Sequence, residues 1–335
     1  MADTTAIEWA DATFNPWMGC EPIGPGCNHC YAKRWVERFG DDFRRRQRTS
    51  PPNWRQPLAW DAKHTAFFAD HGRRRRVFCA SLADVFDNKV PAEWRRDLFD
   101  LIELTPNLDW LLLTKRIGNV HEMVRKAKSG DWLAGRKNVW LGATVVNQVE
   151  ADRDIPTLLA VPAGKRFLSM EPLLGSVQIW PYTSPHCERH RGALDADGKC
   201  EVCESRGIWS IGEPLAEHEK APIRPGIDWV IAGGESGPHA RPMHPDWVRG
   251  LRDQCEAAGV PFLFKQWGEW GPCELHPVGK GEPGVITSAG QLLQGRAMLD
   301  HPEDANAEMI ARFGKAAAGR LLDGRTHDGF PEATR

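Results

Sequence analysis

Several features that would place a protein in a familiar class are missing from this sequence. Trp110-Leu-Leu-Leu113 is among its longest apolar runs, whereas a membrane-spanning helix needs roughly 20 apolar residues. The first residues lack the basic-then-apolar pattern of a secretion signal, so we expect a cytoplasmic protein with no membrane contact. No Gly-x-Gly-x-x-Gly follows a predicted strand, so the fingerprint of a dinucleotide-binding fold is absent.

A strong charge of one sign is missing too. The formal net charge is −2 over 335 residues, which gives no overall attraction to nucleic acid. Basic residues are nevertheless concentrated at 44–48 and 73–76. Such runs either bind phosphates of a nucleic acid or form an ordinary solvated surface. Tyrosine is scarce, with 2 residues against 15 Trp; several of these Trp could stack on bases, and the others would pack in the core.

Cysteine is present in an odd number, 9, and is clustered. Without a secretion signal, this clustering favours metal ligation over a disulfide framework. Cys20, Cys27 and Cys30 follow the spacing Cys-x6-Cys-x2-Cys, and Gly24-Pro-Gly26 predicts a tight loop between the first two. Three thiolates leave one coordination position open, as in an iron–sulfur cluster with one iron free to bind a small molecule. Zinc is the alternative, with His29 nearby.

A second cysteine group interrupts the chain at 176–226. Its residues are Cys187-x2-His190-x9-Cys200-x2-Cys203. Four ligands in two pairs are typical of a closed tetrahedral zinc site. We therefore predict a structural zinc ion in a small insertion, with incidental thiols in a flexible segment as the alternative.

The remaining sequence alternates short apolar segments with amphipathic ones. Strands are predicted at residues 5–9, 77–81, 109–114, 138–144, 166–170, 228–232 and 261–264. Helices are predicted from residue 31, from residue 91, and over 119–128, 149–159, 246–258 and 304–322, with a largely irregular excursion at 41–76. This alternation predicts an α/β fold with a parallel (β/α) barrel, complete or partial; an open doubly wound sheet is the alternative. We expect a barrel domain at 1–270, the insertion at 176–226, and an extension at 271–335 packed on the barrel.

Polar residues stand where the predicted strands end. In a parallel barrel these ends meet at one mouth, together with the cysteine loop after the first strand. The set comprises Ser81, Asp84, Thr114, Lys115, Arg116, Thr144, Asn147, Glu171, Gly233, Gly234, Glu235, Ser236, Lys265 and Gln266. Gly233-Gly234 would allow close approach to the backbone, and Glu235 would accept an ammonium group. Lys115, Arg116 and Lys265 would hold a carboxylate or phosphate. Salt bridges between neighbouring strand ends are the alternative interpretation.

Several stretches together resemble one known family. They are Thr5-Ala-Ile-Glu-Trp9, Asn15-Pro16, Gly19-Cys20, Gly26-Cys27, Cys30-Tyr31-Ala32, Phe167-Leu-Ser-Met-Glu-Pro-Leu174, Trp229-Val-Ile-Ala-Gly-Gly-Glu-Ser-Gly237, Phe262-Leu-Phe-Lys-Gln-Trp-Gly-Glu-Trp270 and Leu322-Asp-Gly-Arg325. In these stretches the chain resembles the phage-associated three-Cys-motif proteins, which have no established activity. That family is similar to the radical S-adenosylmethionine enzymes.

The resemblance implies a [4Fe–4S] cluster on Cys20, Cys27 and Cys30, with S-adenosylmethionine bound at the open iron. In radical S-adenosylmethionine enzymes an electron from the cluster cleaves this cofactor to a 5′-deoxyadenosyl radical that abstracts hydrogen from the substrate. The cofactor-binding residues would be Gly233, Gly234, Glu235, Ser236, Ser81 and Asp84, and the catalytic residues Lys115, Glu171 and Lys265. Three features differ from that pattern. The usual first spacing is Cys-x3-Cys, and the aromatic residue often found just before the last Cys is replaced by His29, with Tyr31 after it. The usual Gly-Gly-Glu follows the second strand rather than a late one.

The sequence therefore predicts a radical S-adenosylmethionine-like enzyme that modifies or repairs a nucleic acid or nucleotide. Its partners would include a reductant protein for the cluster and, from the phage connection, a phage-encoded protein. The alternative is a zinc-containing nucleic-acid-binding protein without redox chemistry.

Overall fold

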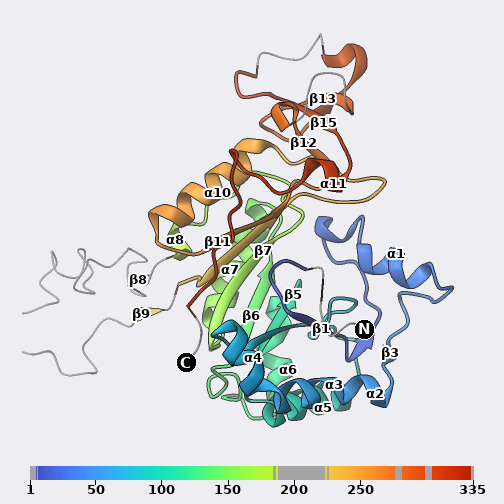
Figure 1. Ribbon diagram of the computed structural model, residues 1–335, viewed down its shortest axis with the longest axis vertical. Helices are drawn as coiled ribbons and strands as arrows, with labels where there is room; N and C mark the ends of the chain where they lie inside the picture. Colours follow the sequence, from blue (N-terminus) through green and yellow to red (C-terminus); the bar gives the residue numbers. More distant parts are fainter. Residues whose placement is uncertain are drawn as a thin grey trace, which may run out of the picture.

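A seven-stranded parallel sheet forms the centre of the molecule (Figure 1). The structure is a computed structural model that describes residues 5, 7–183, 186–187, 223–224, 226–275, 281–298 and 304–332. The strand order is β1-β4-β5-β6-β7-β10-β11. The bounds are β1 Ala12–Phe14, β4 Arg75–Cys79, β5 Leu108–Thr114, β6 Val139–Thr144, β7 Lys165–Met170, β10 Trp229–Gly233 and β11 Phe262–Gln266. Within the described residues, β1 and β11 are the two edge strands of this sheet and do not pair with each other. The curled sheet is therefore a partial barrel rather than a closed one.

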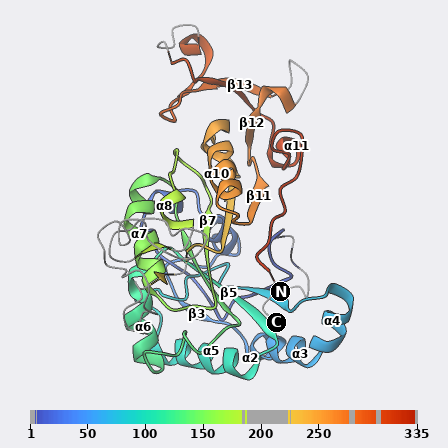
Figure 2. The same cartoon turned by 90° about the vertical axis from the view of Figure 1, so that its left-hand side faces the viewer.

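Helices cover the convex side of the sheet (Figure 2). They are α5 Ala92–Leu104, α6 Val120–Ala127, α7 Gln148–Ala160 and α10 Pro245–Ala257, with the short α8 at Trp180–Thr183. Each long helix buries one apolar stripe; in α5 it contains Leu98, Phe99 and Ile102. α5 begins after Pro91 and α10 at Pro245, because proline is tolerated in the first turn of a helix. Within the described residues, no helix combines the length and apolarity that a membrane crossing requires.

The strands divide the interior into two apolar clusters. Alternate side chains such as Val230 and Ala232 face the helices, whereas Trp229 and Ile231 face the concave side. The concave cluster contains Trp9, Phe78, Leu111, Trp140, Phe167, Trp229, Ile231 and Leu263. These large rings fill the barrel interior beneath the mouth, where Trp9 and Phe78 lie 4.4 Å apart between ring centroids.

The first predicted strand, residues 5–9, is wrong: β1 lies at Ala12–Phe14 instead. Residues 7–10 form a turn in which the Ala10 amide donates to the Ile7 carbonyl. Ile7 and Trp9 pack against the concave cluster. Ile7 and Trp9 therefore bury their side chains inside the barrel, and their backbone does not pair with a neighbouring strand.

The excursion at 41–76 is more regular than predicted. It contains β3 Gln47–Arg48, which pairs with β2 Trp17–Met18, and three helices: α2 Pro51–Trp54, α3 Gln56–Ala62 and α4 His64–His71. Pro51 and Pro52 open α2, and Pro57 lies in the first turn of α3. The prolines therefore start helices here instead of breaking them.

The predicted helix at 304–322 is also wrong. Residues Glu308–Arg312 form β15, and only Lys315–Ala318 are helical, as α11. Gly314 and Gly319, with φ values of 84° and 66°, limit α11 on both sides. β15 belongs to an antiparallel sheet in the order β12-β15-β13-β14, with β12 Trp270–Pro272, β13 Glu282–Ile286 and β14 Leu292–Leu293. This sheet stands at one end of the molecule in both views (Figures 1 and 2).

The predicted zinc ligands fall almost entirely outside the described residues. His190, Cys200 and Cys203 are outside them, and only the backbone of Cys187 is described, in β8 His186–Cys187, which pairs with β9 Ile223–Arg224. The structural zinc ion therefore stays a prediction.

Candidate functional site

A cavity of about 490 Å³ opens at the carboxyl ends of the central strands. Its volume lies in the usual range for sites that bind small molecules. The cavity wall includes Cys20, Cys27, Cys30, Ser81, Asp84, Thr114, Lys115, Arg116, Thr144, Glu171, Gly234, Glu235, Ser236, Lys265 and Gln266. The structure thus brings nearly all of the predicted strand-end residues to one place. Gly233 does not line the cavity, and Asn147 instead caps α7 by accepting from the Glu150 amide at 2.9 Å.

The three cysteines lie in one loop over this cavity. Cys20 follows β2, Cys27 ends the short 3₁₀ helix η1 (Pro25–Cys27), and Cys30 directly precedes α1 (Tyr31–Glu37). All three thiols are half-buried and free of disulfides. The loop is anchored at its start, where the Cys20 amide donates to the Phe43 carbonyl at 2.9 Å.

Three thiols from one loop, none of them in a disulfide, are the donor type that iron–sulfur clusters use. Among the described side chains, no three from His, Cys, Asp and Glu are grouped closely enough to hold one metal ion. An iron–sulfur cluster does not require such a group, because its thiolates bind different irons. His29, the suggested fourth ligand for zinc, points its Nδ1 to Glu235 Oε2 at 2.9 Å.

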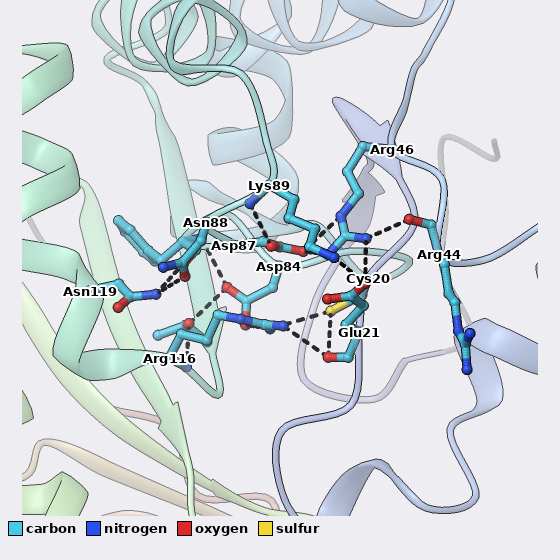
Figure 3. A network of polar contacts seen from close by, with 12 residues as sticks. Cys20, Glu21, Arg44, Arg46, Asp84, Asp87, Asn88, Lys89, Arg116 and Asn119 are labelled. Carbon is cyan, nitrogen blue, oxygen red and sulfur yellow. Dashed lines mark hydrogen bonds and ion pairs between the residues drawn. The ribbon is translucent and has the colours of Figure 1, made fainter.

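Arg116 links Cys20 to a buried carboxylate (Figure 3). Its guanidinium donates to Cys20 Sγ at 3.3 Å, to the Glu21 carbonyl at 2.8 Å and to Asp84 Oδ2 at 3.4 Å. Burial raises the pKa of the Cys20 thiol to about 11, although the Arg116 charge opposes this shift. Hydrogen bonds to the ligand sulfurs are among the contacts that set the reduction potential of an iron–sulfur cluster.

Asp84 itself is occupied by protein donors. It accepts from the Thr114 hydroxyl at 2.8 Å, the Lys115 amide at 3.0 Å and the Phe86 amide at 2.9 Å. This carboxylate therefore fixes the turn after β5 and places Arg116 beside Cys20. Nearby, Lys89 donates to Glu21 Oε1 at 2.5 Å, which connects the start of the cysteine loop to the segment after β4 (Figure 3). Arg46 pairs with Asp87 of the same segment.

Glu235 is the centre of a second buried network. Arg241 donates to Glu235 Oε1 at 2.7 Å and to Oε2 at 2.9 Å, and also to the Pro25 carbonyl at 3.0 Å. Burial raises the pKa of Glu235, but the hydrogen bonds from Arg241 and His29 outweigh it and hold the pKa below its usual value. Because Arg241 and His29 reach both Glu235 and the cysteine loop, this carboxylate joins the end of β10 to that loop.

Two lysines differ in their partners. Lys265 Nζ lies 3.1 Å from Glu171 Oε1, and both side chains are mostly buried. Lys115 has no ion-pair partner among the described residues, and its side chain lies beneath Gly26 of the cysteine loop. A cation of this kind in a cavity wall is suited to a carboxylate or phosphate.

The two glycines after β10 are needed for packing. A Cβ on Gly234 would lie 1.8 Å from the Trp267 carbonyl oxygen, and one on Gly233 would lie 2.8 Å from Glu171 Oε1. The prediction is that a ligand approaches the backbone closely at these glycines. In the structure, the protein segment after β11 occupies the space next to Gly234 instead. Ser81 accepts from Asn15 Nδ2 at 2.9 Å, and the Ser236 carbonyl accepts from Arg34 at 3.0 Å.

The cavity wall also has buried polar atoms without partners. Within the described part of the chain, Trp9 Nε1, Thr144 Oγ1 and Gln266 Oε1 make no hydrogen bond. All three residues line the cavity and are less than one-tenth exposed. An unpaired buried polar atom costs about 1–3 kcal/mol, so a ligand that paired with these groups would recover that loss.

Sequence reasoning missed Arg241, Tyr31 and Trp9 as site residues. Arg241 has no local signal, because it follows Glu235 in a loop whose course the sequence does not specify. Tyr31 carries a detectable signal, since it is adjacent to Cys30. Its hydroxyl donates to the Ser81 carbonyl at 2.5 Å.

The basic run at 73–76 does not lie at the site. Arg75 and Arg76 begin β4, so the run is at the amino ends of the strands, opposite the cavity. Arg73 pairs with Asp11 at 2.6 Å, and Arg76 lies over the Phe330 ring at 3.9 Å. This run therefore has structural partners.

Comparison with known proteins gives one match along most of the chain. The family described as a protein of unknown function (DUF5131) matches residues 4–331. No curated protein matches.

Solved structures of spore photoproduct lyase are similar at a low level. A cysteine-to-serine mutant has 11% identity and a TM-score of 0.35, with 68% of this chain and 56% of the lyase covered. A double mutant with bound AdoMet and dinucleoside spore photoproduct has 11% identity and a TM-score of 0.34, with 73% and 61% covered. The chain thus spans less than two thirds of the length of these proteins.

Proposed function

The chain belongs to DUF5131, a family of proteins of unknown function, and we propose that it is a radical S-adenosylmethionine-like iron–sulfur enzyme that acts on a nucleic acid or nucleotide. One observation carries this proposal. Three free thiols from one loop line the same cavity as the polar residues at the ends of the parallel strands. This places a candidate redox centre next to candidate substrate-binding groups.

Cys20, Cys27 and Cys30 would hold a [4Fe–4S] cluster. When bound, it would supply the electron that cleaves S-adenosylmethionine. The protein's own contribution is to fix the loop, through Arg116 and Asp84 at its start and through Arg241 and Glu235 at its end. The rings of Trp9 and Phe78, which pack against each other in the cavity wall, would limit the access of water to that part of the cavity.

The remaining wall residues would bind the cofactor and substrate. Lys115 would bind a carboxylate or phosphate, since its ammonium has no ion-pair partner in the described structure. Lys265 Nζ donates to Glu171 Oε2 at 3.3 Å, and these two side chains would be placed to transfer a proton to or from a bound substrate. Glu235 already accepts from Arg241 and His29. A ligand ammonium would therefore have to replace the His29 contact.

A nucleotide is the favoured class of substrate. The cavity combines cationic Lys115 and Lys265 with the unpaired polar atoms of Thr144 and Gln266. Phosphates need the cations, and the edge of a base needs both donors and acceptors.

The test is metal analysis of protein purified without oxygen, comparing Cys20→Ala with Cys273→Ala. Cys273 is a half-buried free cysteine that does not line the cavity. We expect about four irons and four sulfides per chain, lost in Cys20→Ala and retained in Cys273→Ala, followed by cleavage of S-adenosylmethionine upon reduction. Zinc alone at the cysteine loop under these conditions would reject the proposal and favour a binding protein without redox chemistry.

A further inference from the structure

Three exposed aromatic residues form a stripe along α1 and the turn that follows it. Tyr31, Trp35 and Phe39 are 52%, 48% and 66% exposed. Tyr31 and Trp35 are four residues apart in α1 and share one side of the helix, and Phe39 lies in the turn after Glu37. The rings of Trp35 and Phe39 are in contact, with centroids 5.0 Å apart at 60°. We call these three residues the α1 aromatic stripe.

The buried side of α1 explains how the helix is oriented. Ala32 and Val36 are buried, and they pack with Phe43 and Leu82 beneath the cysteine loop. This small apolar cluster holds the helix in place. The larger rings of the stripe are left on the outside, although burying them would be more favourable in an isolated protein.

The stripe starts at the mouth of the cavity. Tyr31 directly follows Cys30, lines the cavity, and donates its hydroxyl to the Ser81 carbonyl. Trp35 and Phe39 continue from there along the helix and do not line the cavity. A molecule lying on the stripe would therefore lead into the cavity.

The chain segment that carries the stripe is basic. Residues 31–48 include seven Lys or Arg against three Asp or Glu, although the whole chain has a net charge of −2. Arg38, Arg44 and Arg45 are exposed and have no ion pair among the described residues. The Arg44 side chain extends away from the contacts between Arg46 and Asp87 (Figure 3).

Not every basic run is available in this way. At 73–76, the arginines contact Asp11, Asp109, Phe67 and Phe330. The exposed ring of Phe68 on α4 lies in that part of the chain, without the free arginines seen around α1. At α1, exposed rings occur together with exposed Arg38, and Arg44 and Arg45 follow in the next segment of the chain.

We propose that the α1 aromatic stripe binds single-stranded nucleic acid and directs one of its nucleotides into the cavity. Aromatic faces stack on any base, and neighbouring cations follow the phosphates, which is how sequence-tolerant single-strand sites are built. The ring centroids of Trp35 and Phe39 are 5.0 Å apart, above the ~3.4 Å between stacked nucleotides of a duplex strand. The stripe therefore suits bases that are unstacked, as a base must be before it can enter a cavity. This inference rests on the proposed function for the class of substrate.

The test is the binding of a fluorescein-labelled dT12 oligonucleotide, measured by anisotropy at several salt concentrations. We expect Trp35→Ala and Phe39→Ala each to weaken binding by about tenfold, and Phe68→Ala, an exposed ring elsewhere, to leave it unchanged. A duplex of the same length should bind more weakly than the single strand. Replacing both Arg44 and Arg45 with Gln should reduce the slope of log affinity against log salt by about 1.4, because each phosphate contact to a single strand contributes about 0.7.

Equal affinity of the stripe variants and Phe68→Ala would overturn the inference, as would equal binding of duplex and single strand. A shift in oligomeric state on Trp35→Ala, without loss of oligonucleotide binding, would overturn it by showing that the stripe contacts another protein chain. Iron content is measured on the same samples, because it tests the proposed function separately. Loss of binding in the stripe variants would support the stripe even if the wild-type protein held no cluster.

Discussion

Single charged residues at this site act through their neighbours. Asp84 accepts three hydrogen bonds from the segments after β4 and β5, and contacts Cys20 only through Arg116. Glu235 likewise contacts the cysteine loop through Arg241 and His29. The sequence predicted both carboxylates as ligand-binding residues; in the structure their protein contacts position the loop, and ligand binding by either stays a prediction.

Replacing Arg116 by Met should lower the reduction potential of the reconstituted cluster. The guanidinium donates to Cys20 Sγ at 3.3 Å, and such a donor favours the more negative, reduced state. One net hydrogen bond is worth about 1 kcal/mol, or about 40 mV for a one-electron couple. A redox titration followed by electron paramagnetic resonance measures the shift. Arg116→Lys, which retains the charge, should show a smaller one; an unchanged potential in Arg116→Met would leave Arg116 only as a partner of Asp84.

At the scale of elements, the segments after β10 and β11 are packed against each other. The Gly234 amide donates to the Gln266 carbonyl at 2.9 Å, and the Glu269 amide donates to the Glu235 carbonyl at 3.0 Å. Gly268, with φ 87°, lies directly against the Glu235 carbonyl. These contacts place Glu235 and Lys265 on the same wall of the cavity.

Gly234→Ala should therefore destabilise the protein by about 3 kcal/mol, the upper part of the usual range for overpacking. Its Cβ would lie 1.8 Å from a backbone oxygen, which cannot rotate away as a side chain would. Urea unfolding followed by fluorescence measures the change. The matched control is Gly250→Ala in α10, where no atom lies within 4 Å of the added Cβ. It should raise stability by about 0.8 kcal/mol, since Ala is a better helix former. A similar effect of both changes would contradict the packing of these two segments.

At the scale of the whole molecule, the last described residues return to the central sheet. The Phe264 amide donates to the His327 carbonyl, and Trp229 Nε1 donates to the Gly329 carbonyl at 2.8 Å. The Phe330 ring lies 5.1 Å from the Trp229 ring and beneath Arg76. The end of the chain thus covers the concave cluster on the side opposite the cavity. The division into a barrel at 1–270 and an extension at 271–335 stays a prediction.

Phe330→Ala should lower the free energy of unfolding by about 2 kcal/mol, less than for a fully buried ring because Phe330 is only partly buried. The loss combines apolar contact with Trp229 and the cation–π contact with Arg76. Chemical denaturation measures the loss in Phe330→Ala and compares it with Leu321→Ala. The Leu321 side chain is 45% exposed, so its removal should have little effect. Equal losses in the two variants would show that the chain end does not cover the cluster.

The sequence by itself predicted the central sheet and most of the cavity wall. Continuous apolar segments and amphipathic segments are local patterns, and they indicate buried parallel strands and covering helices without knowledge of the partners. The topology of a parallel sheet then brings the strand ends together, so residues such as Lys115, Glu171 and Lys265 could be grouped in advance.

Only the tertiary structure decided the rest. Residues 5–9 and 12–14 are both suited to a strand, and the packing of Trp9 inside the barrel selects the second. The pairing of Glu235 with Arg241, the Arg73 contact with Asp11 and the strand at Glu308–Arg312 likewise depend on which segments meet. Local propensity is weak compared with the burial and hydrogen bonding that distant segments provide, so these choices are made only when the whole chain is folded.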